Sequence, residues 1–317
     1  MTPTSRITSF AFAAVAAFML SASPAAFGAA ADAPKSIDQI YRERGNDVEF
    51  QKIPPFKMFD NLWYVGPGYV SVYLISTSDG LILIDASEEP HVNHVIDSIG
   101  KAGFNLRDIK YILISHGHLD HFGGVAKIQE LSGARVAAVE QDWQAIEAAG
   151  RAPGRNNSPS PRVPKRDMVI TEGQKLTLGN TTLTLHITPG HTPGVMSAEF
   201  TVFDNGVPHK AFYSGGTGGR GGVKGFEDAV ASTARIIQIP GIEVFLPNHG
   251  WNPGTDYPNG SILARAEKLK TRKAGDPNPF VDPASWRQFI TNAQVRNQRG
   301  LEEERQKAAA GGTPAAQ

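Results

Sequence analysis

The sequence predicts an α/β fold, and three observations support this class. Apolar runs of strand length alternate with segments of helical periodicity from Asn61 onward. The chain has 317 residues, enough for one large domain or two small ones, and 40% of them are hydrophobic, enough for a sizeable core. The 31 basic residues balance the 31 acidic ones, so nucleic acid is not expected as a partner.

The N-terminus is typical of a secretory signal peptide. Arg6 supplies a positive start, Ile7 to Leu20 form a mostly apolar core, and small residues follow from Ala25 to Ala31. A membrane anchor is the alternative, but the apolar run is short for a span of ~20 residues, and Pro24 follows it closely. We expect cleavage near Ala29 to Ala31 and a periplasmic or secreted protein without stable membrane insertion.

The part of the chain before Met168 is predicted to alternate strands with helices. Strands are expected at Tyr69–Ser76, Leu81–Ile84, Ile109–Ser115 and Ala134–Val139, and helices at Val92–Gly100 and Gly123–Leu131. The segment Gly150–Arg166 is rich in Pro, Gly, Ser and Arg, which predicts a long surface loop. Such a loop is either a binding loop or an insertion without a role.

Strands begin again after Met168, a pattern that suggests a duplicated architecture. Turn residues at Gly179-Asn180 and at Asp204-Asn205-Gly206 predict two hairpins, the first of which includes the strand Thr181–Ile187. The remaining expected elements are a strand at Glu243–Leu246 and helices at Glu227–Ile237, Asn259–Lys273 and Ser285–Lys307.

The strongest chemical signal is the segment His116-Gly117-His118-Leu119-Asp120-His121. Four side chains that can bind metals fall within six residues, directly after an apolar strand. A loop at the end of a strand lets His116 and His118 turn toward one point while Asp120 and His121 turn toward another. Imidazole and carboxylate ligands suit Zn²⁺. The alternative, a hydrogen-bonded polar loop, explains this density of ligands poorly.

Each metal needs a further protein ligand, and the chain has no cysteine to supply one. His191 lies in a Thr-Pro-Gly-His-Thr-Pro-Gly turn after a strand, and His249 also follows a strand. Side chains at strand ends can converge at one sheet edge, so both are candidate ligands. The other histidines of the domain are expected to be structural or solvated: His91 and His94 on a surface helix, His186 within a strand and His209 near a hairpin end.

These motifs resemble the metallo-β-lactamase superfamily over roughly Phe56 to His249. The resemblance rests on His-x-His-x-Asp-His after an apolar strand, on Asp85 at the end of an earlier strand, and on the later glycine-flanked histidines. It implies a four-layer αβ/βα sandwich with a zinc site at one edge of two facing sheets. The hydrolase domain would span residues 32–308, after a signal peptide at 1–31 and before a flexible tail at 309–317.

Many hydrolases of the superfamily carry a late Gly-Asp pair whose aspartate bridges two metals, but Gly216 stands at that position here. The class B, subclass-3 β-lactamases also lack this aspartate, and similarity to them implies two zinc ions. The first ion would be held by His116, His118 and His191, and the second by Asp120, His121 and His249. Asp85 would hydrogen-bond a ligand and fix its orientation.

The sequence departs from those lactamases where they contact substrate. A glycine-rich run from Gly215 to Gly225 replaces their short Asp-Ser motif, and we expect it to form a mobile rim loop. The candidate rim residues are Ser214, Thr217, Arg220 and Lys224. Arg220 and Lys224 are expected either to attract an anionic substrate or simply to face solvent.

The resemblance implies a dizinc hydrolase that cleaves a small cyclic amide, a β-lactam, by a metal-bound hydroxide. Asp120 would be both a zinc ligand and the catalytic group that orients or relays the proton. A lactonase or arylesterase with the same dizinc site is the alternative, because the altered rim leaves the substrate open. A zinc-binding protein without catalysis is the alternative of another class. No feature of the sequence specifies an oligomeric state.

Overall fold

Two β-sheets form the centre of the computed structural model, which describes residues 35, 37–154, 159–250 and 260–311. The first sheet has the strand order β1 (Phe56–Phe59), β2 (Leu62–Tyr64), β3 (Tyr73–Thr77), β4 (Gly80–Ile84), β5 (Ile109–Leu113), β6 (Arg135–Val139) and β7 (Met168–Ile170). The second sheet has the order β12 (Val244–Pro247), β11 (Val207–Ser214), β10 (Met196–Asp204), β9 (Thr181–Ile187) and β8 (Lys175–Leu178).

The parallel part of the first sheet decides where polar side chains gather. β4, β5, β6 and β7 pair in parallel, so their carboxyl ends lie at one edge of the sheet. Asp85 follows β4 directly, and His116 follows β5 within three residues. The strands themselves are almost entirely apolar because both faces of this part of the sheet are covered. Polar groups are therefore confined to the strand ends.

The main core lies between the two sheets. It joins Tyr73, Ile75, Ile82 and Ile84 of the first sheet to Leu183, Leu185, Met196 and Ala198 of the second, all buried. Within each strand these residues alternate with residues that face the other way, as the period of two requires. Burial of this apolar surface is the main favourable contribution to folding.

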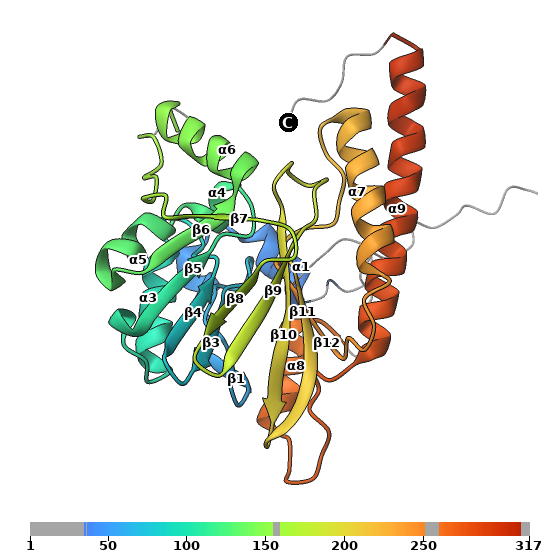
Figure 1. The fold of residues 1–317 in the computed structure, drawn as a ribbon. Helices are drawn as coiled ribbons and strands as arrows, with labels where there is room; N and C mark the ends of the chain where they lie inside the picture. The colour runs from blue at the N-terminus through green and yellow to red at the C-terminus, as the bar shows by residue number, and fades with distance from the viewer. Residues whose placement is uncertain (1–34, 36, 155–158, 251–259, 312–317) are drawn as a thin grey trace, which may run out of the picture. The chain divides into compact units, whose positions relative to one another are not determined.

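Helices cover the outer face of each sheet (Figure 1). α3 (Val92–Lys101), α4 (Leu119–Phe122), α5 (Val125–Ser132) and α6 (Glu140–Arg151) pack on the first sheet through a second apolar cluster. α7 (Gly222–Ile236) and α9 (Pro283–Ala309) pack on the second sheet, where Phe212 and Phe245 contact Trp286 and Phe289. The order helix, sheet, sheet, helix confirms the four-layer αβ/βα sandwich.

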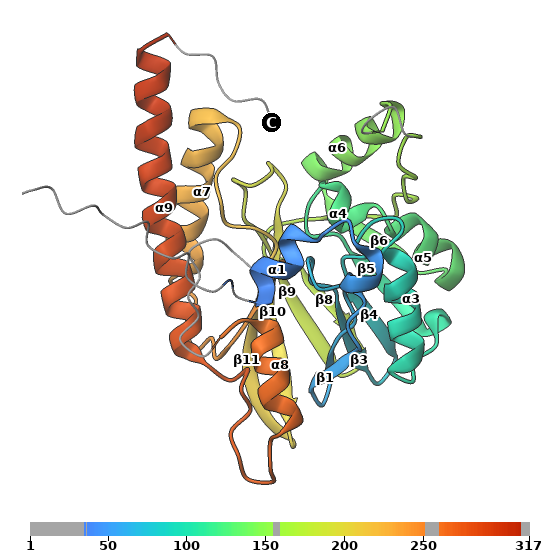
Figure 2. The ribbon, with the colours of Figure 1, turned by 180° about the vertical axis from the view of Figure 1, so that it is seen from behind.

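The shorter elements lie at the margins. α1 (Ile37–Glu43) and α2 (Val48–Gln51) precede β1, and the short 3₁₀ helix Leu106–Asp108 precedes β5. α8 (Ile262–Lys270) contacts both α1 and β1, which Figure 2 shows from behind. Among the described residues, no helix combines the length and the hydropathy that a membrane span requires.

Most strands and hairpins expected from the sequence are present, but three expectations differ. The strand expected from Tyr69 begins at Tyr73, because Ser71 donates its backbone N–H to Asn248 O at 2.8 Å instead of joining the ladder. The helix α6 was not predicted, although Trp143 and Ile146 give it one buried apolar face. Helix α7 begins five residues earlier than expected, within the glycine-rich run.

Two other expectations concern parts of the chain that the structure describes incompletely. The described residues of the segment Gly150–Arg166 beyond α6 form neither helix nor strand, which agrees with a loop, and residues 155–158 lie outside the description. The expected signal peptide at 1–31 lies wholly outside the described residues, as do residues 312–317 of the expected tail.

Candidate metal centre

The histidine-rich segment connects β5 to α4 at the carboxyl edge of the first sheet. His118 has an extended backbone and forms the N-cap of α4, and His121 and Phe122 donate their backbone N–H groups to its carbonyl oxygen at 3.0 and 3.1 Å. The short helix therefore begins immediately after the two histidines of the loop. His116 and His121 are fully buried, whereas His118 and Asp120 are partly exposed.

The first ligand group consists of His116, His118 and His191. His118 Nδ1 lies 2.9 Å from His116 Nε2 and 3.1 Å from His191 Nε2. His191 comes from the turn after β9, so the second sheet contributes one ligand and the first sheet two. One nitrogen from each ring thus points to a common centre.

The second ligand group consists of Asp120, His121 and His249. His121 Nε2 lies 3.1 Å from His249 Nε2, and each of these nitrogens lies 3.5 Å from Asp120 Oδ2. His249 follows β12, so this group also joins the two sheets. The six residues proposed from the sequence are thus brought together in the two expected sets of three.

Both groups fit a tetrahedral metal ion such as Zn²⁺. With metal–ligand distances of about 2.0–2.2 Å, neighbouring ligand atoms in such a site lie about 3.3–3.6 Å apart. The spacing here is 2.9–3.5 Å. Nitrogen and carboxylate oxygen donors are also the ligands that this ion prefers. Three protein donors in each group leave a fourth position for water or substrate.

The ring nitrogens that face away from each centre are held by hydrogen bonds. His121 Nδ1 lies 2.8 Å from Asp85 Oδ2, His249 Nδ1 lies 2.9 Å from Tyr69 O, and His116 Nδ1 lies 3.1 Å from Ser115 Oγ. Such contacts fix the ring orientation and the tautomer of metal-binding histidines. They leave Nε2 of each of these rings for the metal.

Asp85 organises the buried floor of the site, as expected. Its Oδ1 accepts a hydrogen bond from Ser115 N at 2.8 Å, and its Oδ2 accepts from Ser115 Oγ and from Tyr213 OH at 2.8 Å each. Asp85 has a positive φ of 63°, an uncommon conformation for a residue other than glycine. Four short contacts with donors, His121 included, compensate the burial of its charge.

The electrostatics keep most of the donors in the form that binds metals, and His121 is the exception among those with a shifted pKa. Burial, followed by the neighbouring imidazoles, lowers the pKa of His116 and His191 well below the usual value, and lowers that of His249 to about 4. Burial opposes the charge on Asp120, but His121 and His249 outweigh it and lower the pKa of Asp120. Burial lowers the pKa of His121, but Asp120 and Asp85 outweigh it and raise that pKa. At neutral pH, His116, His191 and His249 are neutral while Asp120 is charged.

Comparison with known proteins identifies the family. Residues 65–207 match the family model described as "Metallo-beta-lactamase superfamily". The chain is also 33% identical to BJP-1, a subclass B3 metallo-β-lactamase of Bradyrhizobium japonicum, over 82% of this chain and 98% of that one, with a TM-score of 0.69. The chain belongs to the metallo-β-lactamase superfamily. It is a metal-dependent hydrolase of that superfamily.

Other relatives within the superfamily differ in their activities. The FEZ-1 metallo-β-lactamase of Legionella gormanii is 29% identical over 80% of this chain and 98% of that one, with a TM-score of 0.71. A hydroxyacylglutathione hydrolase of Pseudomonas putida is 32% identical over 106 residues, 33% of this chain, and the match spans only 32% of that enzyme. A hydroxyacylglutathione hydrolase of Acidiphilium cryptum is 26% identical over 61% of this chain and 79% of that enzyme.

The structure explains why the superfamily's bridging aspartate is absent here. Gly216 has a φ of +144°, which L-amino acids rarely adopt. A Cβ atom at this position would lie 3.2 Å from Cβ and Cγ of His191. Any side chain at 216 would press on a ligand of the first group, so the glycine and the position of His191 depend on each other.

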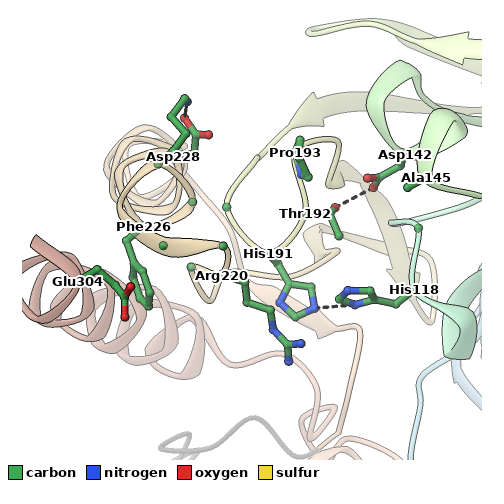
Figure 3. Close-up of a pocket in the computed structure, with 17 residues that line it drawn as sticks. His118, Asp142, Ala145, His191, Thr192, Pro193, Arg220, Phe226, Asp228 and Glu304 are labelled. Carbon is green, nitrogen blue, oxygen red and sulfur yellow. Dashed lines mark hydrogen bonds and ion pairs between the residues drawn. The ribbon is translucent and has the colours of Figure 1, made fainter. Parts of the chain in front are cut away.

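Two adjoining hollows give a substrate access to the metal centre. The metal hollow, about 620 Å³, includes Asp120, His249 and Tyr69. The helix hollow, about 500 Å³, lies between residues of α6 and α7, including Ala145 and Phe226. Both share His118, His191, Gly219 and Arg220. Figure 3 shows residues that line the helix hollow, with His191 and His118 between Phe226 of α7 and Asp142 of α6.

The four candidate rim residues differ in their surroundings. Ser214 is buried at the end of β11 and lines neither hollow, so its assignment to the rim is wrong. Thr217 lines the metal hollow, and Lys224 lines the helix hollow and pairs with Asp228. Arg220 lines both hollows and is exposed, and its guanidinium has no ion pair or hydrogen bond among the described residues.

The glycine-rich run is anchored, contrary to the expectation of a mobile loop. Its C-terminal part belongs to α7. In the remainder, Gly219 N donates to Asn297 Oδ1 at 3.1 Å, and Asn297 Nδ2 donates to Thr217 O at 2.7 Å. Arg220 N donates to Gly190 O at 2.9 Å. The rim is therefore tied to α9 on one side and to the turn that carries His191 on the other.

The remaining histidines lie outside both ligand groups. His91 and His94 are only 4% and 5% exposed, so their placement on a surface helix was wrong, and they pack beneath the N-terminal segment. His186 and His209 contact Glu172 and Glu243, each at 3.3 Å. The supporting roles of Ser115 and Tyr213 were not predicted from the sequence. For Tyr213 the available signal was a tyrosine next to the end of a strand, at a position that faces the core.

Proposed function

We propose that this protein is a dizinc hydrolase that opens the cyclic amide of β-lactams. The observation that carries the proposal is the pair of complete ligand groups combined with a glycine at the position of the bridging acid. The 33% identity to BJP-1 over nearly all of that lactamase supports the same substrate class. The donor set supports zinc as the metal, with three imidazoles in one group and two imidazoles with a carboxylate in the other.

When bound, Zn²⁺ supplies Lewis acidity, which lowers the pKa of water and polarises a carbonyl group. The chain's own residues supply order and a proton acceptor. Asp85 fixes the ring of His121, and Ser115 fixes that of His116. Asp120 directs Oδ2 to the second group, and we assign its other oxygen to accept and relay the proton released by the attacking water.

The two hollows suit a substrate with parts on both sides of the scissile bond. The metal hollow would hold the reacting amide, and the helix hollow would hold a substituent against Phe226 and Pro193. Arg220 stands where the hollows meet, and we propose that it attracts the carboxylate that β-lactams carry.

Hydrolysis of an ester or thioester by the same centre is the second candidate. The hydroxyacylglutathione hydrolases among the relatives favour it, because they resemble this chain in sequence and their name specifies a glutathione thioester as substrate. The substrate assay below includes both.

The test is turnover by the purified, zinc-loaded protein of a penicillin, a carbapenem, an acyl lactone and an acylglutathione thioester. We expect hydrolysis of at least one β-lactam, its loss in a His118→Ala variant, and its retention in a His209→Ala control, which replaces a histidine outside the centre. Hydrolysis of the lactone or the thioester without hydrolysis of a β-lactam would replace the β-lactam proposal with the second candidate. No hydrolysis of any of the four would contradict both.

We also propose that the chain is exported to the periplasm or secreted. The support is the sequence of residues 1–31. Fractionation of producing cells, with N-terminal sequencing of the mature protein, is the test. A mature N-terminus near Ala29 to Ala31 is expected, and an unprocessed protein confined to the cytoplasm would contradict export.

A further inference from the structure

We propose that Asp142 is a positioning residue that holds the two loops of the first ligand group, His116–His118 and the His191 turn, in register with each other. Asp142 touches no ligand directly, and it belongs to α6, an element that contributes nothing to either ligand group. The inference rests on the metal centre of the proposed function and not on its substrate.

The contact to the His191 turn is a hydrogen bond between side chains. Thr192 Oγ1 donates to Asp142 Oδ2 at 2.8 Å, and Thr192 follows the ligand His191 directly. The turn is also closed internally, because Gly190 N donates to Thr192 O at 3.0 Å. Moving Thr192 would therefore move His191. Figure 3 shows the bond from Asp142 to Thr192 beside the contact of His191 with His118.

The contact to the other loop is a close backbone approach. Gly117 separates His116 from His118, and a Cβ atom there would lie 3.3 Å from Ala145 Cβ and 3.4 Å from Asp142 O. Across the site, a Cβ atom at Gly194 would lie 2.8 Å from Asp142 N and 3.0 Å from its Cγ. The backbone N–H groups of Gly117 and Gly194 both stabilise the charged form of the Asp142 carboxyl. The groups that stabilise it, Thr192 included, thus come from the two loops that carry ligands.

The burial of the Asp142 carboxyl group lowers the stability of the fold. Asp142 is fully buried, and its Oδ1 accepts no hydrogen bond among the described residues. Burial raises the pKa of Asp142 to about 6, despite the donors around it. A buried acceptor without a partner destabilises a fold. Groups of this kind are retained where function needs them, which sets Asp142 apart from a structural residue of the core.

The experiment measures zinc affinity one group at a time. In a His249→Ala background only the first group is complete, and in a His191→Ala background only the second. Zinc is titrated against a competing chelator into each protein with and without Asp142→Asn. Removing an indirect support of a metal ligand typically weakens binding 10–100-fold. We expect a loss of about this size in the first background and a change below about threefold in the second.

Three further variants test whether the effect is specific. Thr192→Val should also lower the zinc affinity of the first group, whereas Thr192→Ser should retain it because serine keeps the hydroxyl. Gln144→Ala, on the exposed face of α6, should leave the zinc affinity unchanged. If Asp142→Asn does not fold, Thr192→Val and Thr192→Ser decide the question alone. Thermal unfolding of each metal-free variant shows whether a loss of affinity reflects general destabilisation.

Equal loss at both groups, or unchanged affinity at the first group in Asp142→Asn and Thr192→Val, would overturn the inference. The readout uses zinc alone, so it stands whether or not a β-lactam is hydrolysed. A wild-type protein that binds no zinc would overturn the inference and the metal centre together. A protein that binds zinc but hydrolyses no β-lactam would contradict only the substrate.

Discussion

At the scale of single residues, the two buried aspartates of the site differ in how fully hydrogen-bond donors compensate the burial of their carboxyl groups. Asp85 has four short contacts with donors at its carboxylate. Asp142 accepts one side-chain hydrogen bond, from Thr192, and among the described residues its Oδ1 accepts none, although the N–H groups of Gly117 and Gly194 also favour its charged form. A buried carboxylate with too few donors shifts toward its protonated form. Asp142 should therefore contribute to the pH dependence of the stability of the fold.

This difference predicts the pH dependence of the metal-free protein. The pKa of Asp142 rises from 3.8 to about 6 on folding. Between about pH 4 and 6 the Asp142 carboxyl of the folded state therefore holds a proton that the unfolded state has released, so the contribution of Asp142 to stability falls as pH rises through this window and is constant above it. Asp142→Asn lacks this titration, and its stability relative to wild type should rise by about 3 kcal/mol from pH 4 to pH 7.

Denaturant unfolding of the metal-free wild type and Asp142→Asn at pH 4 and pH 7 measures this difference. The matched control is Asp167→Asn. Burial opposes the charge on Asp167, but the N–H of Val136 and the side chains of Lys165 and Gln129 outweigh it and lower the pKa, so this substitution should act in the opposite direction. Parallel profiles of stability against pH for wild type and Asp142→Asn would show that folding does not raise the pKa of Asp142.

At the scale of secondary-structure elements, α9 supports the substrate rim from outside the centre. Asn297 bonds the rim backbone at Thr217 and Gly219, and it is 2% exposed. One turn later, a Cβ atom at Gly300 would lie 2.1 Å from Phe226 Cε1, so the glycine lets the ring that lines the helix hollow lie against α9. The helix thus fixes two parts of the rim at once.

Asn297→Leu should disturb substrate binding more than chemistry. It leaves a backbone donor and acceptor without partners, which costs about 1–3 kcal/mol for each group that stays buried. We expect KM for a hydrolysed substrate to rise severalfold, kcat to stay within about threefold, and amide hydrogen exchange of Gly219 to accelerate. The control is Gln298→Leu, which also replaces a side-chain amide with leucine but at the exposed neighbouring position.

Unchanged exchange at Gly219 in Asn297→Leu would show that the bond to α9 does not hold the rim. A fall in kcat with KM unchanged would show that the rim acts on the reaction instead of on binding. Zinc content should equal that of wild type in both variants, since α9 supplies no ligand.

Elements with strong periodicity could be predicted, and elements shaped by distant contacts could not. The strand Thr181–Ile187 has the expected bounds because its alternation matches its half-buried setting. Tyr69–Val72 is also rich in aromatic and β-branched residues, yet Tyr69 and Ser71 bond instead to the loop that carries His249. The glycine-rich run suggested mobility, because sequence alone does not show an anchor about 80 residues away.

At the scale of the whole domain, each sheet supplies part of each ligand group. The local spacing from His116 to His121 made four ligands predictable, and strand-end positions identified His191 and His249. The partners of the ring nitrogens were harder to predict, because a backbone carbonyl such as that of Tyr69 has no signature in the sequence. Substrate recognition was hardest, since the rim combines segments from both halves and from α9.

This arrangement makes the metal centre a consequence of correct packing between the two sheets. The first group needs His191 beside His118, and the second needs His249 beside His121. Zinc should therefore stabilise the folded domain, because the complete groups exist only when the sheets face each other.

The central claim is that two zinc ions in these groups hydrolyse a β-lactam. The most direct measurement is the rate of β-lactam ring opening by protein whose zinc content is determined in the same sample. We expect two zinc ions per chain and turnover that disappears when a chelator removes them and returns when zinc is restored. Protein with two zinc ions per chain that opens no β-lactam ring would contradict the proposed function.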